Sequence, residues 1–221
     1  MSKVVVITGA NRGIGLELAR QWQQQGYSVL AACRQRSEAL DELGVEVVDG
    51  VDVTDDQALP RLKSALGDRR ISILMNNAGL LCNETLEAMD LAQIQRQFEI
   101  NTLGPLRITH GLLDCLDHGS KVGLVTSRMG SVADNSSGGR YGYRISKAAL
   151  NAAGKSLAID LAPKGIAVAL LHPGWVQTEM TGYSGLVSPQ QAAQALIARM
   201  DGLNLDNTGT FWHADGSELP W

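Results

Sequence analysis

Short apolar, β-branched runs alternate with longer helical patterns along the whole chain of 221 residues. The first run, residues 3–8 (KVVVIT), is continuously apolar, as expected of a strand that is buried on both faces of a parallel sheet. Six successive strand–helix repeats require right-handed crossovers, which place helices on both faces of the sheet. No linker or shift in composition divides the chain. The pattern therefore predicts an α/β fold, a single doubly wound domain over residues 1–221 with a parallel sheet of about seven strands.

The boundaries of these elements follow from turn and cap residues. Thr54 begins the acidic sequence TDD, which is typical of a helix N-cap followed by negative charge in the first turn. Gly26 and Gly67 are expected to end helices. The expected strands are residues 3–8, 27–32, 45–51, 71–75, 121–126, 166–171 and 209–213, and the expected helices are residues 14–25, a short segment that ends near Gly44, 54–66, 91–115, 143–161 and 189–200.

Composition excludes several classes of protein. The net charge of −4 lacks the basic field that nucleic acid binding requires, so no nucleic acid partner is expected. No apolar run reaches the roughly 18 residues of a membrane span, and residues 4–7 are too short for a signal peptide, so a cytoplasmic location without membrane attachment is expected. The widely spaced Cys33, Cys82 and Cys115 are interpreted as free thiols. None of the four histidines has metal-ligand spacing, so no metal site is predicted.

A glycine-rich segment, residues 8–15 (TGANRGIG), directly follows the first strand. Its glycine spacing, G-x-x-x-G-x-G, is a relative of the dinucleotide-binding fingerprint. Between a buried strand and a helix N-terminus, glycines let the backbone turn tightly and approach a pyrophosphate, whose charge meets the unpaired N–H groups of the helix. The alternative is an ordinary strand-to-helix turn. The predicted cofactor-binding residues of this loop are Gly9, Asn11, Arg12, Gly13, Ile14 and Gly15.

The end of the second strand indicates which dinucleotide binds. Proteins that bind NAD usually carry a carboxylate there for the ribose 2′-hydroxyl. This chain has Cys33 at that position, followed by Arg34, and Arg12 lies in the glycine-rich segment. Guanidinium groups suit a 2′-phosphate, which arginine binds in a fork. The sequence therefore favours NADP(H) over NAD(H), and the alternative is that Arg34 and Arg36 are solvated surface charges.

Two further loops fall at the carboxyl ends of strands, where ligands bind in folds of this kind. Asp52, with Val53 beside it, follows the third strand and is predicted to accept a hydrogen bond from an adenine amino group. Its alternative is an N-terminal charge for the next helix. The segment NNAG follows the fourth strand, and its alternative is a turn that needs the backbone freedom of Asn and Gly. From it we predict cofactor contacts by Asn77, Ala78 and Gly79.

A tyrosine and a lysine lie four residues apart on one helix face, at Tyr143 and Lys147. A phenol with an ordinary pKa of about 10 is a poor acid or base at neutral pH. The neighbouring ammonium group is therefore expected to lower the pKa of Tyr143 and make proton transfer feasible. An exposed helix face is the commonplace alternative for such a pair. Ser127 ends the fifth strand and offers a hydroxyl for a carbonyl oxygen, with Ser131 and Ser146 as competitors.

Six segments, taken together and in this order, resemble the short-chain dehydrogenase/reductase family. They are TGANRGIG, NNAG at residues 76–79, NTLG at residues 101–104, Ser127, YRISK at residues 143–147 and HPGWVQT at residues 172–178. The resemblance covers essentially the whole chain. The segments TSRMGS and YGYRISKAALN, with the Pro-Trp ending, are similar to the sniffer-type carbonyl reductase and C-signal subgroup.

The resemblance implies a Rossmann fold and an NADP-dependent oxidoreductase of the carbonyl reductase type. Such an enzyme transfers a hydride between NADP(H) and a small carbonyl or alcohol substrate. The alternative function is a cofactor-binding, C-signal-like regulatory or signalling protein with little turnover.

The resemblance also implies a role for each matching position. Tyr143 would be the general acid in carbonyl reduction, and Lys147 would lower the pKa of Tyr143 and hold the nicotinamide ribose. Ser127 would hydrogen-bond the substrate oxygen. Asn101 would anchor a water that links Lys147 to solvent, and its alternative is a helix-kinking amide before Gly104. The nicotinamide amide would lie between Pro173, Gly174, Val176 and Thr178.

Two departures from the family pattern affect the site. Ser127 lies 16 positions before Tyr143, a few more than usual, and the extra residues fall in the glycine- and serine-rich segment 134–140, which is expected to bulge outward. Only 15 positions separate Pro173 from Ser188, where the family builds its substrate lid, so an open site is expected. Candidate walls for the substrate are Leu80, Arg128, Met129, Trp175, Met180 and Tyr183.

Assembly is a further implication of the resemblance. Family members pair through two long helices, which correspond to residues 91–115 and 143–161 of this chain. A homodimer or homotetramer is therefore expected. Small residues that would permit close contact between the helices are Ala148, Ala149, Ala152, Ala153 and Gly154, and the alternative for part of this run is packing on the sheet.

Overall fold

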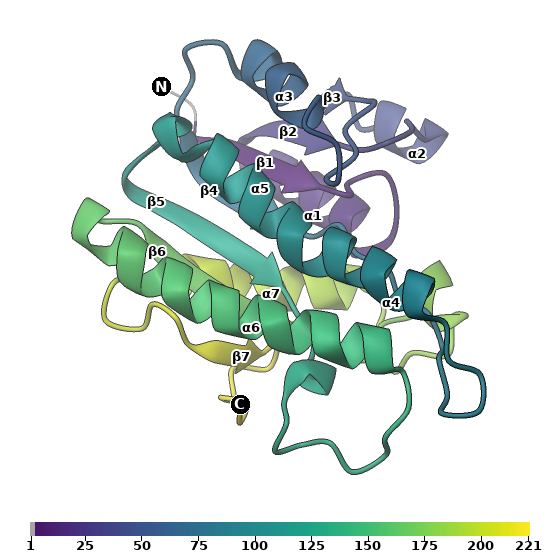
Figure 1. Cartoon of the computed structure of the whole chain (residues 1–221). Coiled ribbons are helices and arrows are strands. Elements are labelled where there is room, and N and C mark those ends of the chain that lie inside the picture. Colours follow the sequence, from purple (N-terminus) through teal and green to yellow (C-terminus); the bar gives the residue numbers. More distant parts are fainter. Residues whose placement is uncertain (1–2) are drawn as a thin grey trace.

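In the computed structural model, which describes residues 3–221, the chain forms a parallel sheet with helices on both faces (Figure 1). Within the described residues the sheet has seven strands in the order β3-β2-β1-β4-β5-β6-β7, and each neighbouring pair is parallel. This arrangement confirms the predicted doubly wound α/β fold. The strands are β1 (Val4–Thr8), β2 (Ser28–Ala32), β3 (Glu46–Val48), β4 (Ile71–Asn76), β5 (Leu116–Val125), β6 (Ala167–His172) and β7 (Phe211–His213).

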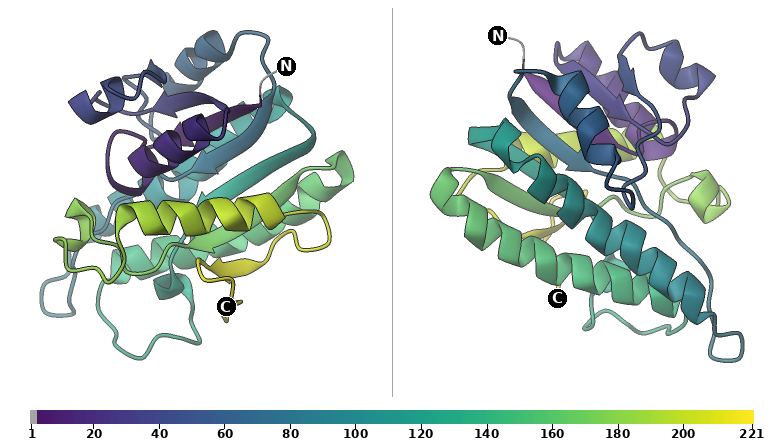
Figure 2. Two further views of the ribbon diagram at one scale, coloured as in Figure 1. Left: turned by 180° about the vertical axis from the view of Figure 1, so that it is seen from behind. Right: turned by 45° about the horizontal axis from the view of Figure 1, so that its top comes forward.

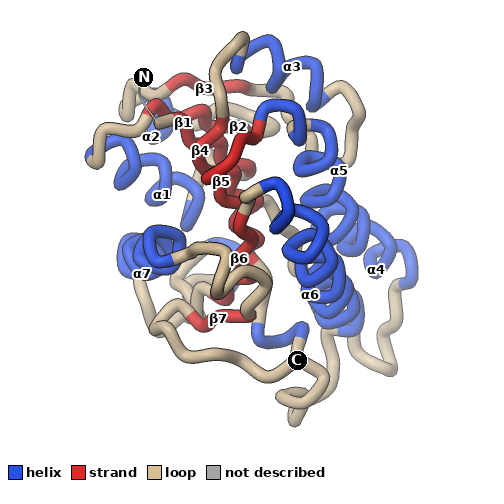
Figure 3. The backbone as a smooth tube through the Cα atoms, turned by 90° about the vertical axis from the view of Figure 1, so that its left-hand side faces the viewer, coloured by secondary structure: helices blue, strands red, loops and turns tan. Residues whose placement is uncertain are grey.

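The helices form two layers, one on each face of the sheet (Figures 2 and 3). One layer holds α1 (Gly13–Gln24), α2 (Glu38–Asp41) and α7 (Pro189–Gly202), and the other holds α3 (Ala58–Leu66), α4 (Leu91–Phe98), α5 (Gly104–Gly111) and α6 (Tyr141–Leu161). Short 3₁₀ turns occur at Leu113–Cys115, Arg128–Gly130, Ala162–Lys164 and Glu179–Thr181. No helix within residues 3–221 combines the length and the apolar character needed to span a bilayer.

Alternate side chains of β1 show how one buried strand serves both layers. Val4 and Val6 pack into the core beneath α3, α5 and α6, whereas Val5 and Ile7 pack into the core beneath α1 and α7. Because successive residues of a strand point to opposite faces, a strand buried on both faces must be apolar at every position. The continuous apolar run of the sequence is explained by this double burial.

Two strands and two helices differ from their predicted extents. The third strand is shorter than residues 45–51, and the fifth begins at Leu116, before the predicted residue 121. The helix expected over residues 91–115 is interrupted, since α4 passes into a π-helical turn at Glu99–Leu103 before α5 begins. The N-cap predicted at Thr54 is wrong, because α3 begins only at Ala58. The Thr54 N–H and hydroxyl both donate to Asp52 Oδ1, so a local turn takes these groups away from the helix.

The carboxyl ends of the parallel strands meet at one edge of the sheet, which we call the carboxyl edge. Gly9 follows β1, Cys33 follows β2, Asn77 follows β4, Ser127 lies two residues beyond β5, and Pro173 follows β6. Strand order reverses between β1 and β4, and open α/β sheets bind ligands at such a switch point. The fold therefore brings the predicted loops to one edge.

Candidate active site

The glycine loop, residues 9–15, packs so closely against its surroundings that two of its glycines have no room for a side chain. A Cβ atom on Gly15 would lie 2.2 Å from the Gly9 carbonyl oxygen, and one on Gly9 would lie 2.9 Å from Ala78 Cα. Gly9 and Gly13 also have positive φ angles, of 67° and 54°. The spacing of the glycines therefore reflects a backbone that other residues cannot adopt here.

Asn77 ties the glycine loop to the end of β4. Its Nδ2 donates to the carbonyl oxygens of Thr8 and Gly9, both at 3.1 Å. The N–H groups of Asn77 and Ala78 donate to Thr8 Oγ1 at 3.0 and 3.2 Å. Asn77 thus shapes the loop, and the cofactor contact expected of it stays a prediction.

The N-terminus of α1 is open to an anion. Arg12 is the N-cap residue with an extended backbone, and no side chain among residues 3–221 caps the first turn. That turn contains no acidic residue. Its N–H groups and the positive end of the helix dipole fit the pyrophosphate that the glycine spacing predicts.

The arginines near the end of β2 differ in their partners. Arg36 pairs with Asp41 at 2.7 Å, and Arg12 reaches Glu179 at 2.9 Å. Arg34 is exposed and forms no ion pair with any residue in the described range 3–221. Arg34 is therefore the guanidinium most available to a 2′-phosphate.

Two other predicted cofactor residues of this region are held by neighbouring loops. Asn11 Nδ2 donates to the Gln35 carbonyl oxygen at 3.1 Å, and the Asn11 carbonyl oxygen accepts from the Ser37 hydroxyl at 2.6 Å. Ile14 packs against the core beneath α1 and α7. These contacts fix the glycine loop on the β2–α2 connection.

Asp52 is half-buried beside the buried Val53. Burial acts to raise the pKa of Asp52, but hydrogen bonds from the N–H and hydroxyl of Thr54 and the charges of Arg34 and Arg96 leave that pKa below its ordinary value. Asp52 is therefore a carboxylate at neutral pH, with Oδ1 already bonded to Thr54. The adenine contact stays a prediction.

Ser127, Tyr143 and Lys147 converge where β5 ends beside the first turns of α6, and all three are buried. The Ser127 side chain lies near enough to the Tyr143 phenol to act on its pKa, and it accepts from the Met129 N–H at 3.1 Å. Lys147 Nζ donates to the Val125 carbonyl oxygen at 2.8 Å and lies 5.7 Å from the centre of the Tyr143 ring. The three residues that the sequence predicts to be catalytic in this region are thus close together at the carboxyl edge.

The pKa of Tyr143 shifts in the direction opposite to the prediction. Burial raises it to about 12, although the hydrogen bond from Ser127 and the charge of Arg140 act to lower it. Burial also lowers the pKa of Lys147 to about 7. Removal from water penalises the phenolate and the ammonium alike, so the protein's own groups keep Tyr143 protonated at neutral pH. The predicted lowering of the Tyr143 pKa by Lys147 is therefore wrong for the chain itself.

Asn101 lies in the π-helical turn and is fully buried. Its Nδ2 donates to the Leu80 carbonyl oxygen at 2.8 Å and to Ser146 Oγ at 3.0 Å, and its Oδ1 accepts from the Leu80 N–H at 2.8 Å. Ser146 Oγ in turn donates to the Tyr143 carbonyl oxygen at 2.9 Å. Asn101 therefore joins one predicted substrate wall to α6. The water relay to Lys147 stays a prediction.

Ser131, the competitor of Ser127, has other partners. Its hydroxyl donates to the Trp221 carbonyl oxygen at 3.1 Å and accepts from the Asp134 N–H at 3.1 Å. The segment that follows bulges away from the helices (Figure 1), as its composition predicts. Ser127 therefore keeps its contact with Tyr143 despite the extra residues.

The β6–α7 connection returns toward the glycine loop. Pro173 begins it, Gly174 has a φ of 88°, and the buried Val176 pairs with Val187 in an isolated bridge. Thr178 lies next to the glycine loop, because a Cβ atom on Gly13 would come within 3.3 Å of Thr178 Cγ2. Both predicted cofactor-binding segments therefore border the same space.

The predicted substrate walls include the apolar residues of this connection. Trp175, Met180 and Tyr183 are 36%, 44% and 70% exposed. Trp175 Nε1 donates to the Ser184 carbonyl oxygen at 2.9 Å, and Arg128 on the opposite connection is paired with an aspartate. These exposures and hydrogen bonds do not show a substrate contact, so the role of these residues as substrate walls stays a prediction.

Arg140, which belongs to none of the predicted motifs, lies beside Met129 and Trp175. Its partners come from segments far apart in the chain, so no local pattern reveals them. The signal present in the sequence is its position directly before the helix that carries Tyr143.

Comparison with known proteins agrees with this geometry. A family model described as short chain dehydrogenase matches residues 3–186. The chain is 41% identical over 227 residues to 1-hydroxy-2-glutathionyl-2-methyl-3-butene dehydrogenase of Rhodococcus sp. (strain AD45), with 100% of both chains covered. It is 46% identical to C-signal of Myxococcus xanthus over 156 aligned residues. This alignment covers 68% of this chain and 93% of C-signal.

Solved structures are similar over the whole length. The carbonyl reductase Sniffer of D. melanogaster has a TM-score of 0.92 at 28% identity, with 100% of both chains covered. The NADPH-bound carbonyl reductase from chicken fatty liver has a TM-score of 0.90 at 26% identity, covering 100% of this chain and 99% of that one.

The parallel sheet, the glycine loop and the buried Ser-Tyr-Lys cluster define an oxidoreductase of the Rossmann type. The chain belongs to the short-chain dehydrogenase/reductase family. The predicted family and enzyme class are confirmed, and NADP(H), the predicted cofactor, is the one named for the chicken reductase.

Proposed function

We propose that the protein transfers a hydride between NADP(H) and a small carbonyl or alcohol substrate, as a carbonyl reductase. The main support is the buried cluster at the carboxyl edge, in which the hydroxyls of Ser127 and Tyr143 meet and Lys147 lies one helical turn further along α6. Donors held together away from water stabilise the negative charge that develops on a carbonyl oxygen during reduction.

NADPH, when bound, supplies the hydride. The glycine loop and the open N-terminus of α1 would hold its pyrophosphate, and residues 77–79 and 173–178 would hold its nicotinamide end. The fit is supported by the tight turn of the loop, in which a Cβ atom on Gly9 or Gly15 would collide with neighbouring backbone, because such a turn leaves the N–H groups at the start of α1 open to an anion.

Tyr143 gives its proton to the substrate oxygen. The phenol is protonated at neutral pH because burial raises its pKa to about 12, so it is in the state that carbonyl reduction needs. Ser127 donates a hydrogen bond to the same oxygen, and the Met129 N–H orients the Ser127 hydroxyl. Lys147 uses one N–H for the Val125 carbonyl oxygen, which leaves two for the nicotinamide ribose hydroxyls.

Preference for NADP(H) is supported by the end of β2. The buried Cys33 occupies the position at which an NAD-binding protein usually has a carboxylate, and the exposed Arg34 follows it. A phosphate in this position therefore meets a guanidinium and no competing acid from β2.

Reduction of a panel of aldehydes and ketones, followed as oxidation of NADPH or NADH, tests this function. We expect turnover with NADPH and a much lower kcat/KM with NADH. Arg34→Ala should raise the KM for NADPH about 10- to 100-fold, which corresponds to the loss of one charge-assisted hydrogen-bonded contact, and should leave the KM for NADH unchanged. Arg36→Ala is the matched control, because Arg36 is paired with Asp41. Equal use of NADPH and NADH by the wild-type protein would contradict the proposed cofactor.

A cofactor-binding regulatory or signalling protein is the second candidate, supported by the similarity to C-signal. It predicts tight NADPH binding without turnover across the whole carbonyl panel. The presence of Asn101, Ser127, Tyr143 and Lys147 together favours the enzyme, because a protein free of catalytic demand does not need all four groups.

Assembly into a homodimer or homotetramer and a cytoplasmic location remain part of the proposal. Ile145 and Ile159 of α6 are 49% and 64% exposed, which supports a contact between copies of this helix. Gly154 follows the alternative of packing on the sheet, since a Cβ atom on it would lie 2.7 Å from Leu124 Cδ1. A monomer seen by light scattering at micromolar concentration would contradict the assembly.

A further inference from the structure

Arg140 is held in an unusual backbone conformation beside the catalytic phenol. It is the N-cap residue of α6, with φ 49° and ψ 46°, a left-handed conformation that is uncommon for residues other than glycine. Its N–H donates to the Glu84 carbonyl oxygen at 2.8 Å, which holds the backbone in place. Such conformations persist only where the surroundings enforce them, and they cluster at functional sites.

The guanidinium group of Arg140 is the meeting point of three connections at the carboxyl edge. Its Nε donates to Asn83 Oδ1 at 3.0 Å on the β4–α4 connection. Its Nη1 lies 3.9 Å from Met129 Sδ on the β5–α6 connection, and its Cζ lies 5.9 Å from the centre of the Trp175 ring on the β6–α7 connection. Met129 and Trp175 are predicted substrate walls, so this group is positioned within the same part of the site.

The charge of Arg140 has no carboxylate partner within residues 3–221. Arg128, by contrast, pairs with Asp134 at 2.7 Å. Glu84 is adjacent, but its carboxylate is buried and accepts from the Gly142 N–H. A guanidinium has five N–H donors, and only one of those of Arg140 has an oxygen acceptor, with a second directed at the weak thioether.

The position relative to Tyr143 links this group to the reaction. Arg140 directly precedes the first turn of α6, which carries Tyr143. Its neighbour Met129 donates its N–H to Ser127 Oγ, so the guanidinium lies in the same part of the site as the proposed donors. The charge of Arg140 acts to lower the pKa of Tyr143, which places the guanidinium within electrostatic reach of the proton that is transferred. A substrate whose carbonyl contacts Tyr143 thus has a cationic group nearby.

We infer that Arg140 determines substrate class by binding an anionic group, a carboxylate or sulfonate, on the carbonyl substrate. This inference rests on the proposed function. Two parallel N–H groups of a guanidinium match the two oxygens of such an anion, whereas a neutral group of the same shape leaves them without a charged acceptor. The contact orients the carbonyl toward Tyr143 and Ser127, so it acts on substrate binding rather than on proton transfer.

A matched pair of aldehydes, 4-carboxybenzaldehyde and its neutral ester methyl 4-formylbenzoate, tests the inference with NADPH as the reductant. The wild-type kcat/KM is expected to be about 10- to 100-fold higher for the carboxylate, mainly through KM, as for one charge-assisted contact. Arg140→Gln should raise KM for the carboxylate alone. Arg140→Lys should retain part of the preference, because it keeps the charge and loses the fork.

Arg144→Gln is the matched control, because Arg144 lies one turn further along α6 and bonds to Ser137 Oγ at 2.9 Å. It should leave the preference unchanged. An equal kcat/KM for the two wild-type reactions, or a preference that survives in Arg140→Gln, overturns the inference and leaves the proposed function standing.

Calorimetry of benzoate and benzamide binding to the complex with NADP⁺ gives a readout without turnover. Tighter binding of benzoate that is lost in Arg140→Gln supports the inference, and equal binding overturns it. A binding preference for benzoate without reduction of any carbonyl in the panel would overturn the proposed function while the anion site stands.

Discussion

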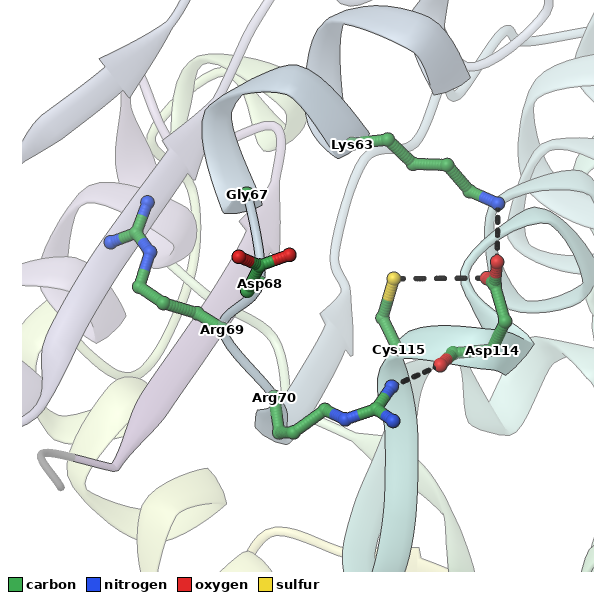
Figure 4. A pocket seen from close by; sticks show the side chains of 7 residues that line it. All are labelled: Lys63, Gly67, Asp68, Arg69, Arg70, Asp114 and Cys115. Atoms are coloured by element: carbon green, nitrogen blue, oxygen red, sulfur yellow. Dashed lines mark hydrogen bonds and ion pairs between the residues drawn. The ribbon is translucent and has the colours of Figure 1, made fainter.

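The two edges of the sheet differ in the burial of their charged groups, although exposed ion pairs occur at both. At the amino edge, where β4 and β5 begin, a cavity of about 400 Å³ is lined by seven residues that include three basic and two acidic side chains (Figure 4). Lys63 pairs there with Asp114 at 2.9 Å, and Arg70 with Asp117 at 3.3 Å, with all four side chains 43% to 69% exposed. At the carboxyl edge, Lys147 is buried and has no carboxylate partner among the described residues.

This difference shows that a hollow lined by charges is not by itself a site. Exposed ion pairs contribute about 0–1 kcal/mol each and largely cancel one another's field. Burial without a charge partner instead shifts proton affinity, to a pKa of about 12 for Tyr143 and about 7 for Lys147. Groups perturbed in this way are those that acid–base chemistry uses.

Tyr143→Phe should produce the largest effect at the carboxyl edge. Loss of the proton donor is expected to lower kcat about 100- to 10,000-fold, with NADPH binding retained, because general acid catalysis contributes a factor of this size. Steady-state kinetics and fluorescence titration of NADPH measure the two quantities. Tyr141→Phe, two positions earlier in the same helix, is the control and should leave kcat unchanged. Full turnover in Tyr143→Phe would show that the proposed acid is wrong.

Lys147→Met should separate stability from activity. The pKa of Lys147 is about 7 in the folded chain, against about 10.4 for an unperturbed lysine, so between these values the unfolded chain binds more protons and stability rises with pH. Burying the ammonium therefore costs stability in full below about pH 7, and the cost disappears toward about pH 10. Thermal unfolding should show a higher Tm for Lys147→Met at about pH 6 and a smaller gain at about pH 9, together with a large loss of turnover.

The control for Lys147→Met is Lys155→Met, an exposed position on the same helix, which should show no pH-dependent gain in Tm. A Tm difference for Lys147→Met that grows with pH would contradict the assigned cost of burial.

Lys63→Ala at the amino edge should have the smallest effect. Its ion pair with Asp114 is exposed, so the free energy of unfolding is expected to change by less than about 1 kcal/mol. The kcat/KM for NADPH and an aldehyde should stay at the wild-type value. A clear fall in kcat/KM would mean that the cavity at the amino edge takes part in function, and the contrast between the two edges would fail.

Local patterns were sufficient for much of the fold and the site. A short stretch of sequence is enough to predict each of three features: the double burial of β1, the glycine loop, and the pairing of Tyr143 with Lys147 four residues later. The direction of the Tyr143 pKa shift could not be predicted from a local pattern, because it depends on burial by segments distant in the chain. The partners of Arg140 on three different connections escaped prediction for the same reason.

Competition between local alternatives explains the remaining differences. Thr54 has the composition of an N-cap, but Asp52 two residues earlier binds both its donors. The π-helical turn at Glu99–Leu103 leaves no signature in apolar periodicity, since it lies between two helices that would otherwise read as one. At Thr54 and at Glu99–Leu103 alike, the residue types were interpreted correctly, but the predicted hydrogen-bond pattern is not the one that forms.

That π-helical turn also has a meaning for changes in chain length. A π turn accommodates one residue more than a regular α-helix while the helix continues on either side. Deleting one residue there would place Pro105, which lacks an N–H, inside a regular helix, whereas at present it lies in the first turn of α5. It would also move Asn101 off Leu80 and Ser146. A change in chain length that the bulging segment before α6 can absorb is therefore expected to disturb both the helix and the contacts of Asn101 here.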